Sequence, residues 1–183
     1  VDLPAVLITF LITYILFVGI KESAKVNNII VGIKIVVILL FLFLGASHIN
    51  FANFKPYLPF GWSGVGAAAA IIFFAYIGFD AVSTAAEETK NPKKDVPLGI
   101  SLCLGVIILL YVCVAFVLTG MVPFKEIDVG NALPAALGRI GIHWGGALVA
   151  TGAIIGMIST LLVTVYGQVR IFMVMSRDGL IPD

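Results

Sequence analysis

The stretch from Ile71 to Pro92, IIFFAYIGFDAVSTAAEETKNP, is apolar enough to cross a bilayer but carries polar residues near its middle. Inside lipid every polar group needs a partner within the protein, so irregular backbone survives only beside a cavity or a packed interface. Gly78 is typical of a helix stop, and Asp80 after it is typical of an N-cap that starts a new helix. The pattern therefore predicts a discontinuous helix that breaks near Gly78.

A helix that stops within the membrane leaves backbone carbonyls without partners, and these carry the negative end of a half-helix dipole. Such oxygens attract an ammonium group, so this stretch predicts a binding site for a substrate amine. The residues of that site are Phe74, Ala75, Ile77 and Gly78. The alternative is a continuous helix, in which Gly78 is a packing residue and Asp80 bonds to a neighbouring helix.

Two further apolar segments carry groups that could hold or replace a coupling cation. Lys34 lies in VGIKIVVILLFLFLG, and a lysine about 9 Å into a span either snorkels to the interface or faces the protein interior. Gly156, Ser159 and Thr160 lie in ATGAIIGMISTLLVTVYG. Such hydroxyls either bond back to their own helix and permit close packing, or help to hold a small cation.

The charged turn EETKNPKKDVP follows the predicted break. Its two prolines, Pro92 and Pro97, are expected to end one helix and begin the next. The charges are most simply a solvated cytoplasmic turn, but Glu87 lies at the membrane edge and could form gate contacts, as Asp80 could form a gate or a helix cap.

The sequence also has to be considered as that of a membrane-embedded enzyme. The sequence GWSG around Ser63 matches the G-x-S-G pattern of intramembrane serine proteases, and HWGG at His143 resembles their partner histidine region. Ser63, however, precedes its span among interfacial aromatic residues, whereas a protease needs its serine in a water-filled cavity within the bundle. The sequence therefore favours a protein that is not an enzyme. A non-transporting membrane scaffold or channel is a further alternative.

The elements that must position these groups are membrane helices. Of 183 residues, 61% are apolar and only 11% are charged, and the mean hydropathy is +1.14. A span needs about 20 apolar residues, and five segments qualify, at about residues 3–20, 29–47, 65–86, 98–119 and 145–165. We expect an all-α integral membrane protein in which residues 1–183 form a single transmembrane region of a larger chain. The scattered basic residues indicate no nucleic-acid partner, and nothing indicates a cofactor or a metal.

The basic residues also predict an orientation. Seven of the 11 Lys and Arg residues lie in the connections on one side, namely Lys21, Lys25, Lys90, Lys93, Lys94, Arg170 and Arg177. By the positive-inside rule that side is cytoplasmic. The N-terminus of the chain is then expected outside and its C-terminus in the cytoplasm.

Four motifs in the chain resemble signatures of the amino acid, polyamine and organocation (APC) transporter superfamily. They are GIKESAKVNN, IKIVVILLF, FFAYIGFDAVSTAAEETKNPKKDVPLGI and YGQVRIFMVMSRDGLIP, in the same order as in that family. The resemblance covers essentially the whole chain and is nearest to bacterial relatives of the cationic amino acid transporters. It implies helices four to eight of a LeuT-like core, which has at least ten helices in two inverted repeats.

The resemblance also implies roles for the residues named above. Phe74, Ala75 and Ile77 match the carbonyls that hold the substrate amine, and Lys34 matches a lysine that replaces sodium in proton-coupled members. Gly156, Ser159 and Thr160 match positions that line the same ion site. Because burial disfavours the charged form of a lysine, Lys34 could release its proton when the pocket changes its exposure.

By the same resemblance, the chain is part of a permease of the cell inner (plasma) membrane, a secondary transporter that works by proton symport. The expected partners are an amino acid, protons (with sodium as the alternative), membrane lipid and the remaining helices of the parent chain. The family's first helix, which supplies amides for the substrate carboxylate, is absent from these 183 residues. Half of the binding site is therefore expected to come from outside them.

Overall fold

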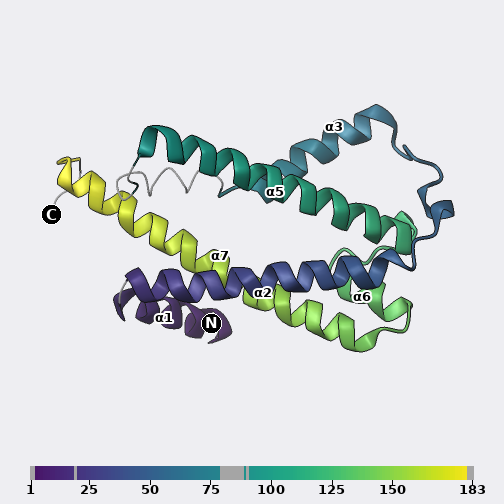
Figure 1. The fold of residues 1–183 in the computed structure, drawn as a ribbon, viewed down its shortest axis with the longest axis horizontal. Helices are drawn as coiled ribbons and strands as arrows, with labels where there is room; N and C mark the ends of the chain where they lie inside the picture. The colour runs from purple at the N-terminus through teal and green to yellow at the C-terminus, as the bar shows by residue number, and fades with distance from the viewer. Residues whose placement is uncertain (1–2, 19, 79–88, 90, 181–183) are drawn as a thin grey trace. The chain divides into compact units, whose positions relative to one another are not determined.

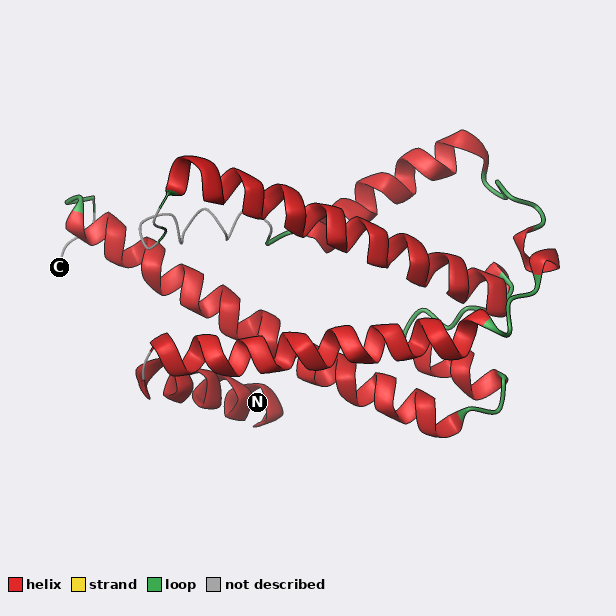
Figure 2. Ribbon diagram, viewed as in Figure 1, coloured by secondary structure: helices red, strands yellow, loops and turns green. Residues whose placement is uncertain are grey.

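The computed structural model describes residues 3–18, 20–78, 89 and 91–180, and the described residues form helices and connecting loops without any strand (Figures 1 and 2). The elements in chain order are α1 (Leu3–Val18), α2 (Ile20–Ala46), the 3-10 turn η1 (Phe51–Phe54), α3 (Gly61–Ile72), the 3-10 turn η2 (Phe73–Tyr76), α5 (Pro92–Met121), the 3-10 turn η4 (Phe124–Glu126), α6 (Ala132–Arg139) and α7 (His143–Arg177).

Among the described residues, three helical segments are long and apolar enough to cross a membrane: Asn27–Ala46, Pro92–Met121 and His143–Arg177. Two shorter apolar helical segments are also present: Ala5–Tyr14 lies in the first predicted span, and Gly61–Tyr76 overlaps the third. The chain is thus an all-α membrane protein. The inverted repeat and the discontinuous helix remain predictions.

Three helices are longer than the predicted spans. The expected connection KESAKVNN is helical within α2, because it contains no glycine or proline and includes good helix formers. Helix α5 already begins at Pro92, where a missing N–H costs nothing and Asp95 in the first turn favours the helix dipole. Pro97 lies inside α5, so the expectation that it begins the helix is wrong. Helix α7 runs on to Arg177.

The described residues divide into two compact units, one of Val1–Val36 with Thr151–Asp183 and one of Val37–Ala150. In the second unit the core consists of four side chains that are at most 6% exposed: Phe41, Val117, Leu137 and Val149. These come from α2, α5, α6 and α7, so the four helices share one apolar core. Glycine allows close approach here, because a Cβ on Gly45 would lie only 2.5 Å from Val117 Cγ1.

In the first unit, Ile12 of α1 and Leu162 of α7 are almost fully buried, with exposed fractions of 2% and 3%. Ser159 of α7 is the buried polar residue among the described residues, also at 2%. A buried hydroxyl needs a hydrogen-bond partner. The first unit therefore has a polar contact in its interior, next to the predicted cation residues.

Candidate functional site

Helix α3 ends within the apolar segment, before the predicted break. The α-helix stops at Ile72, η2 continues it as a 3-10 turn to Tyr76, and Ile77 is extended with ψ 132°. Gly78 follows with φ +114°, a backbone conformation that glycine adopts far more readily than other residues. Helical backbone therefore ends at Tyr76, two residues before the predicted break at Gly78. The helix predicted to follow Gly78 lies outside the described residues.

The carbonyls at this end have partners. The Phe74 carbonyl accepts a long hydrogen bond from the Ile77 amide at 3.4 Å, and the Ala75 carbonyl accepts one from Tyr111 Oη at 3.3 Å. The rings of Tyr76 and Tyr111 lie 5.3 Å apart. The expectation that these carbonyls are free is therefore wrong for Phe74 and Ala75 in this structure. Both bonds are long and hence weak.

Tyr111 belongs to α5 and was missed in the sequence. The available signal was a phenol in the middle of an apolar span, where a hydroxyl needs a partner. The side chains of Phe74 and Ile77 are exposed in the described structure, by 71% and 64%. Among the described residues, the end of α3 therefore presents backbone oxygens beside the Tyr111 hydroxyl.

Lys34 and Gly156 lie against each other in the first unit. A Cβ built on Gly156 would lie 2.9 Å from Lys34 Cε, 3.8 Å from Cγ and 3.9 Å from Cδ. The aliphatic stem of Lys34 therefore passes over the α7 backbone at Gly156, where no side chain projects. Lys34 is half-buried, whereas Lys25 on the same helix is exposed. The two residues singled out from separate segments of the sequence thus meet.

The two predicted hydroxyls of α7 have different partners. Ser159 Oγ donates to Asn27 Oδ1 of α2 at 2.6 Å, while Thr160 Oγ1 donates to the Gly156 carbonyl of its own helix at 3.1 Å. Thr160 thus bonds back to its own helix, which is the alternative to holding a cation. Asn27 was missed, although an amide seven residues before Lys34 falls on the same side of a helix. That spacing was the signal that could have found it.

Asp80 and Glu87, predicted as gate or cap residues, lie outside the described residues. The rival serine site can be described. Ser63 lies in the first turn of α3, its hydroxyl donates to the Phe60 carbonyl at 3.4 Å, and no hydrogen bond joins it to His143 in the described part of the chain. His143 begins α7. The geometry offers no support for a serine nucleophile with a histidine base.

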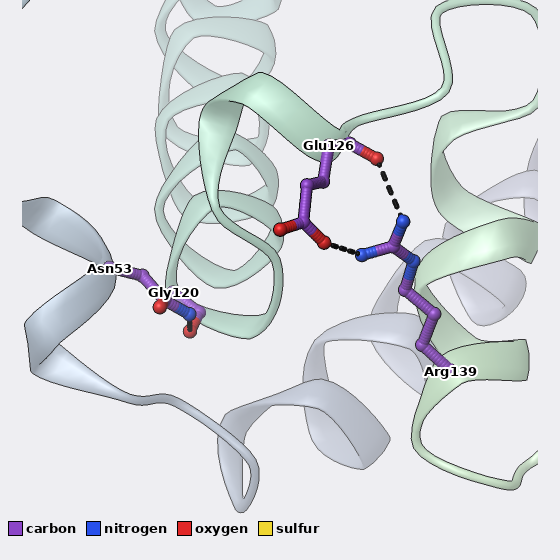
Figure 3. Close-up of polar contacts among 4 residues, drawn as sticks. All are labelled: Asn53, Gly120, Glu126 and Arg139. Carbon is purple, nitrogen blue, oxygen red and sulfur yellow. Dashed lines mark hydrogen bonds and ion pairs between the residues drawn. The ribbon is translucent and has the colours of Figure 1, made fainter.

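The connections around α6 are held by polar contacts (Figure 3). Asn53 Nδ2 donates to the Gly120 carbonyl at 2.7 Å, and the Asn50 amide donates to the same oxygen at 2.9 Å. The Arg139 guanidinium forms an ion pair with the Glu126 carboxylate and also donates to the Glu126 carbonyl at 3.2 Å. The first two bonds connect η1 to the C-terminal end of α5, and the Arg139 contacts connect the C-terminal end of α6 to η4. Both helix ends are thereby held to neighbouring turns within the second unit.

The chain is similar to known membrane proteins along its whole length. Residues 3–183 match the model of the amino acid permease family. The chain is 48% identical over 182 residues to the branched-chain amino acid permease BcaP of Bacillus subtilis (strain 168), and the match covers 99% of this chain and 39% of that protein. It is 47% identical over 181 residues to the methylthioribose transporter of the same organism, covering 99% and 39%.

A plant relative is also similar. The chloroplastic cationic amino acid transporter 9 of Arabidopsis thaliana is 40% identical over 182 residues, covering 100% of this chain and 32% of that protein. The chain thus spans about two fifths of the length of the two bacterial relatives and about one third of the plant one.

Proposed function

The chain belongs to the amino acid permease family, and from this premise we propose that its parent protein is a secondary active transporter of amino acids that works by alternating access. The observation that carries the proposal is the end of α3 at Ile72 within an apolar segment, followed by the 3-10 turn η2 to Tyr76 and by non-helical backbone at Ile77 and Gly78. Backbone of this kind in lipid requires a cavity or a packed interface beside it. Secondary transporters bind substrate at such interrupted helices.

The substrate class follows from the chemistry of this helix end. Carbonyl oxygens at a helix C-terminus attract a cation, and the ammonium group is common to all α-amino acids. The relatives are named for branched-chain amino acids, methylthioribose and cationic amino acids. Recognition of the amine by the segment Phe74–Gly78 is compatible with amino acids of either side-chain class, so the proposal stops at amino acids.

Proton coupling is the finer part of the proposal. Lys34 is half-buried, and its stem lies over Gly156 in a segment that crosses the membrane. An ionisable side chain at such a place is a functional candidate by default, since burying it is costly. We assign Lys34 as the group that binds and releases the coupling proton. Gly156 provides the space, and Ser159 and Thr160 belong to the same region of α7.

The orientation is proposed from charge. The side that carries seven of the 11 basic residues is cytoplasmic in a plasma membrane, which puts the start of the chain outside. Val129, in the connection between η4 and α6, is 96% exposed and would lie outside. An epitope inserted there should be labelled on intact cells. Labelling only after permeabilisation would show that the chain has the opposite orientation.

The function is tested with the full-length parent protein in proteoliposomes. Vesicles loaded with an unlabelled amino acid should take up the same labelled amino acid by counterflow, and uptake should be stimulated by substrate on the opposite side. Flux that lacks this stimulation would identify a channel, and binding without flux would identify a scaffold or sensor. Labelling of Ser63 by a fluorophosphonate would instead support the protease.

Coupling is tested in the same vesicles with an inward proton gradient. Lys34→Ala should retain counterflow but lose gradient-driven accumulation. Lys25→Ala is the matched control, because Lys25 is an exposed lysine on the same helix. Undiminished proton-driven accumulation by Lys34→Ala would remove Lys34 from the mechanism while leaving amino acid transport intact.

A further inference from the structure

The hydrogen bond between Ser159 and Asn27 joins two helices that are far apart in the sequence. Ser159 Oγ donates to Asn27 Oδ1 at 2.6 Å across a separation of 132 residues. Ser159 is 2% exposed and Asn27 is half-buried. Both residues belong to the unit of Val1–Val36 and Thr151–Asp183. This is a polar contact in the interior of that unit, made by side chains and not by backbone.

The bond is the neighbour of the Lys34 contact. Asn27 precedes Lys34 by seven residues on α2, which is close to two helical turns, so both lie on the same side of that helix. Ser159 follows Gly156 by three residues on α7 and shares its side. The pairs Asn27 with Ser159 and Lys34 with Gly156 are therefore two successive contacts between the same two helices.

The two contacts differ in how strictly they fix the helices. The Lys34 stem is a flexible aliphatic chain over a glycine, and such a contact tolerates sliding. A hydrogen bond between two short side chains has a narrow range of distance and angle. Sliding α2 along α7 would break it and leave the Ser159 hydroxyl without Asn27 in a site that excludes water. Polar pairs between membrane helices are known to hold helices together in this way.

We propose that Asn27 is a positioning residue for Lys34: its bond to Ser159 fixes the height of α2 against α7 and so holds the Lys34 ammonium at the depth where it binds and releases the coupling proton. This inference rests on the proposed role of Lys34. Asn27 acts through the register of the two helices.

The test compares exchange with accumulation in proteoliposomes of the full-length parent. Asn27→Ala and Ser159→Ala should each lower proton-driven accumulation by about threefold or more, the factor that corresponds to the loss of a typical interhelical hydrogen bond. Counterflow exchange by Asn27→Ala, which needs no net proton movement, should stay near the wild-type rate. A purely structural role would lower exchange and accumulation together, so this split separates positioning from folding.

The controls use residues that share helix and chemistry. Asn28→Ala removes the adjacent exposed amide of α2, and Thr164→Ala removes an α7 hydroxyl that bonds at 2.8 Å to the Thr160 carbonyl of its own helix. Both should behave like wild type. The double variant Asn27→Ala with Ser159→Ala should be no worse than either single variant, because both remove the same bond. Ser159→Cys keeps a weak donor of similar size and should fall between.

Each outcome decides the matter. If Lys34→Ala loses accumulation while Asn27→Ala and Ser159→Ala keep it, the positioning role is overturned and the coupling role of Lys34 stands. A parallel loss of exchange and accumulation also overturns it, in favour of a structural bond. If Lys34→Ala keeps accumulation, the coupling proposal and the inference fail together. If Ser159→Ala does not express, the thermal midpoints of Ser159→Cys, Asn27→Ala and the variant with both changes measure the bond between Asn27 and Ser159. Additive shifts of these midpoints would show that the two side chains do not interact, and would contradict the positioning role.

Discussion

Gly156 lies directly beneath the side chain of Lys34, and a methyl group on Gly156 would stand 2.9 Å from Lys34 Cε. The contact joins α2 to α7 through two residues that lie more than a hundred positions apart in the chain. The missing side chain of Gly156 is thus the space that the Lys34 stem fills. A lysine stem can lie along apolar surface while its ammonium group reaches a polar environment.

Gly156→Ala should therefore displace Lys34 without unfolding the protein. The clashing atom is near the end of a flexible side chain, so the cost of overpacking should stay at the low end of about 1–3 kcal/mol and be partly offset by the better helix propensity of alanine. Proton-driven accumulation should fall by about tenfold, the equivalent of about 1.4 kcal/mol, while counterflow persists. Gly167→Ala is the control, since Gly167 belongs to the same helix and a Cβ added there has nothing within 4 Å. Equal accumulation by the two variants would contradict the prediction.

Tyr111→Phe should strengthen binding of the substrate amine. The phenol donates to the Ala75 carbonyl at 3.3 Å, and removing it frees this oxygen for an ammonium group, while the ring can still pack on Tyr76. The half-saturating concentration of amino acid should fall by up to about fivefold, corresponding to about 1 kcal/mol for one hydrogen bond. Tyr57→Phe, at an 83% exposed position, is the matched control. A rise in the half-saturating concentration would show that Tyr111 orients this helix end instead of competing for it.

Gly78→Ala should destabilise the end of α3. Its φ of +114° is unfavourable for any residue with a Cβ, and the cost is about 1–2 kcal/mol or more. The thermal midpoint of the purified parent should fall, and uptake should fall with it. Gly66→Ala lies within α3, where nothing is within 4 Å of the added carbon. Gly66→Ala should be neutral or slightly stabilising. Equal thermal midpoints for Gly78→Ala and Gly66→Ala would contradict the prediction.

Gly120→Ala should destabilise the second unit by overpacking. The added carbon would lie 2.8 Å from Ile49 Cγ2 and 3.3 Å from Phe54 Cζ. We expect a loss of about 1–3 kcal/mol in the free energy of unfolding, measured as a lower midpoint in thermal or denaturant unfolding. Gly105→Ala, also in α5, meets nothing within 4 Å and should be neutral. A neutral Gly120→Ala would mean that η1 can move away from α5 at little cost.

Helix α6 offers a comparison of a surface ion pair with a core side chain. Arg139→Gln removes a pair whose side chains are 48% and 57% exposed, so the free energy of unfolding should change by less than about 1 kcal/mol, with a smaller effect at high salt. Leu137→Ala empties a fully buried site in the same helix and should cost about 2–5 kcal/mol. Denaturant midpoints of the two variants would check the order, and a larger loss for Arg139→Gln would reverse it.

The sequence by itself determined that this is a helical membrane protein and where its polar interruptions lie. Hydropathy is a local property, so runs of apolar residues identify spans wherever they occur. The helix α3 ends at Ile72, six residues before the glycine at which the sequence predicts a break. The helix ends at Ile20, Pro92 and Arg177 were missed, because amphiphilic helix formers and an N-terminal proline continue a helix beyond its apolar part.

Only the tertiary structure decided which of these groups meet. The contacts of Lys34 with Gly156, of Asn27 with Ser159 and of Tyr111 with Ala75 join segments that no spacing rule relates. Each depends on how far one helix is rotated and shifted against another, which is set by the packing of all side chains at once. For this reason the sequence could name Ser159 and Ala75 as candidates, but could not show that Asn27 and Tyr111 are their respective partners.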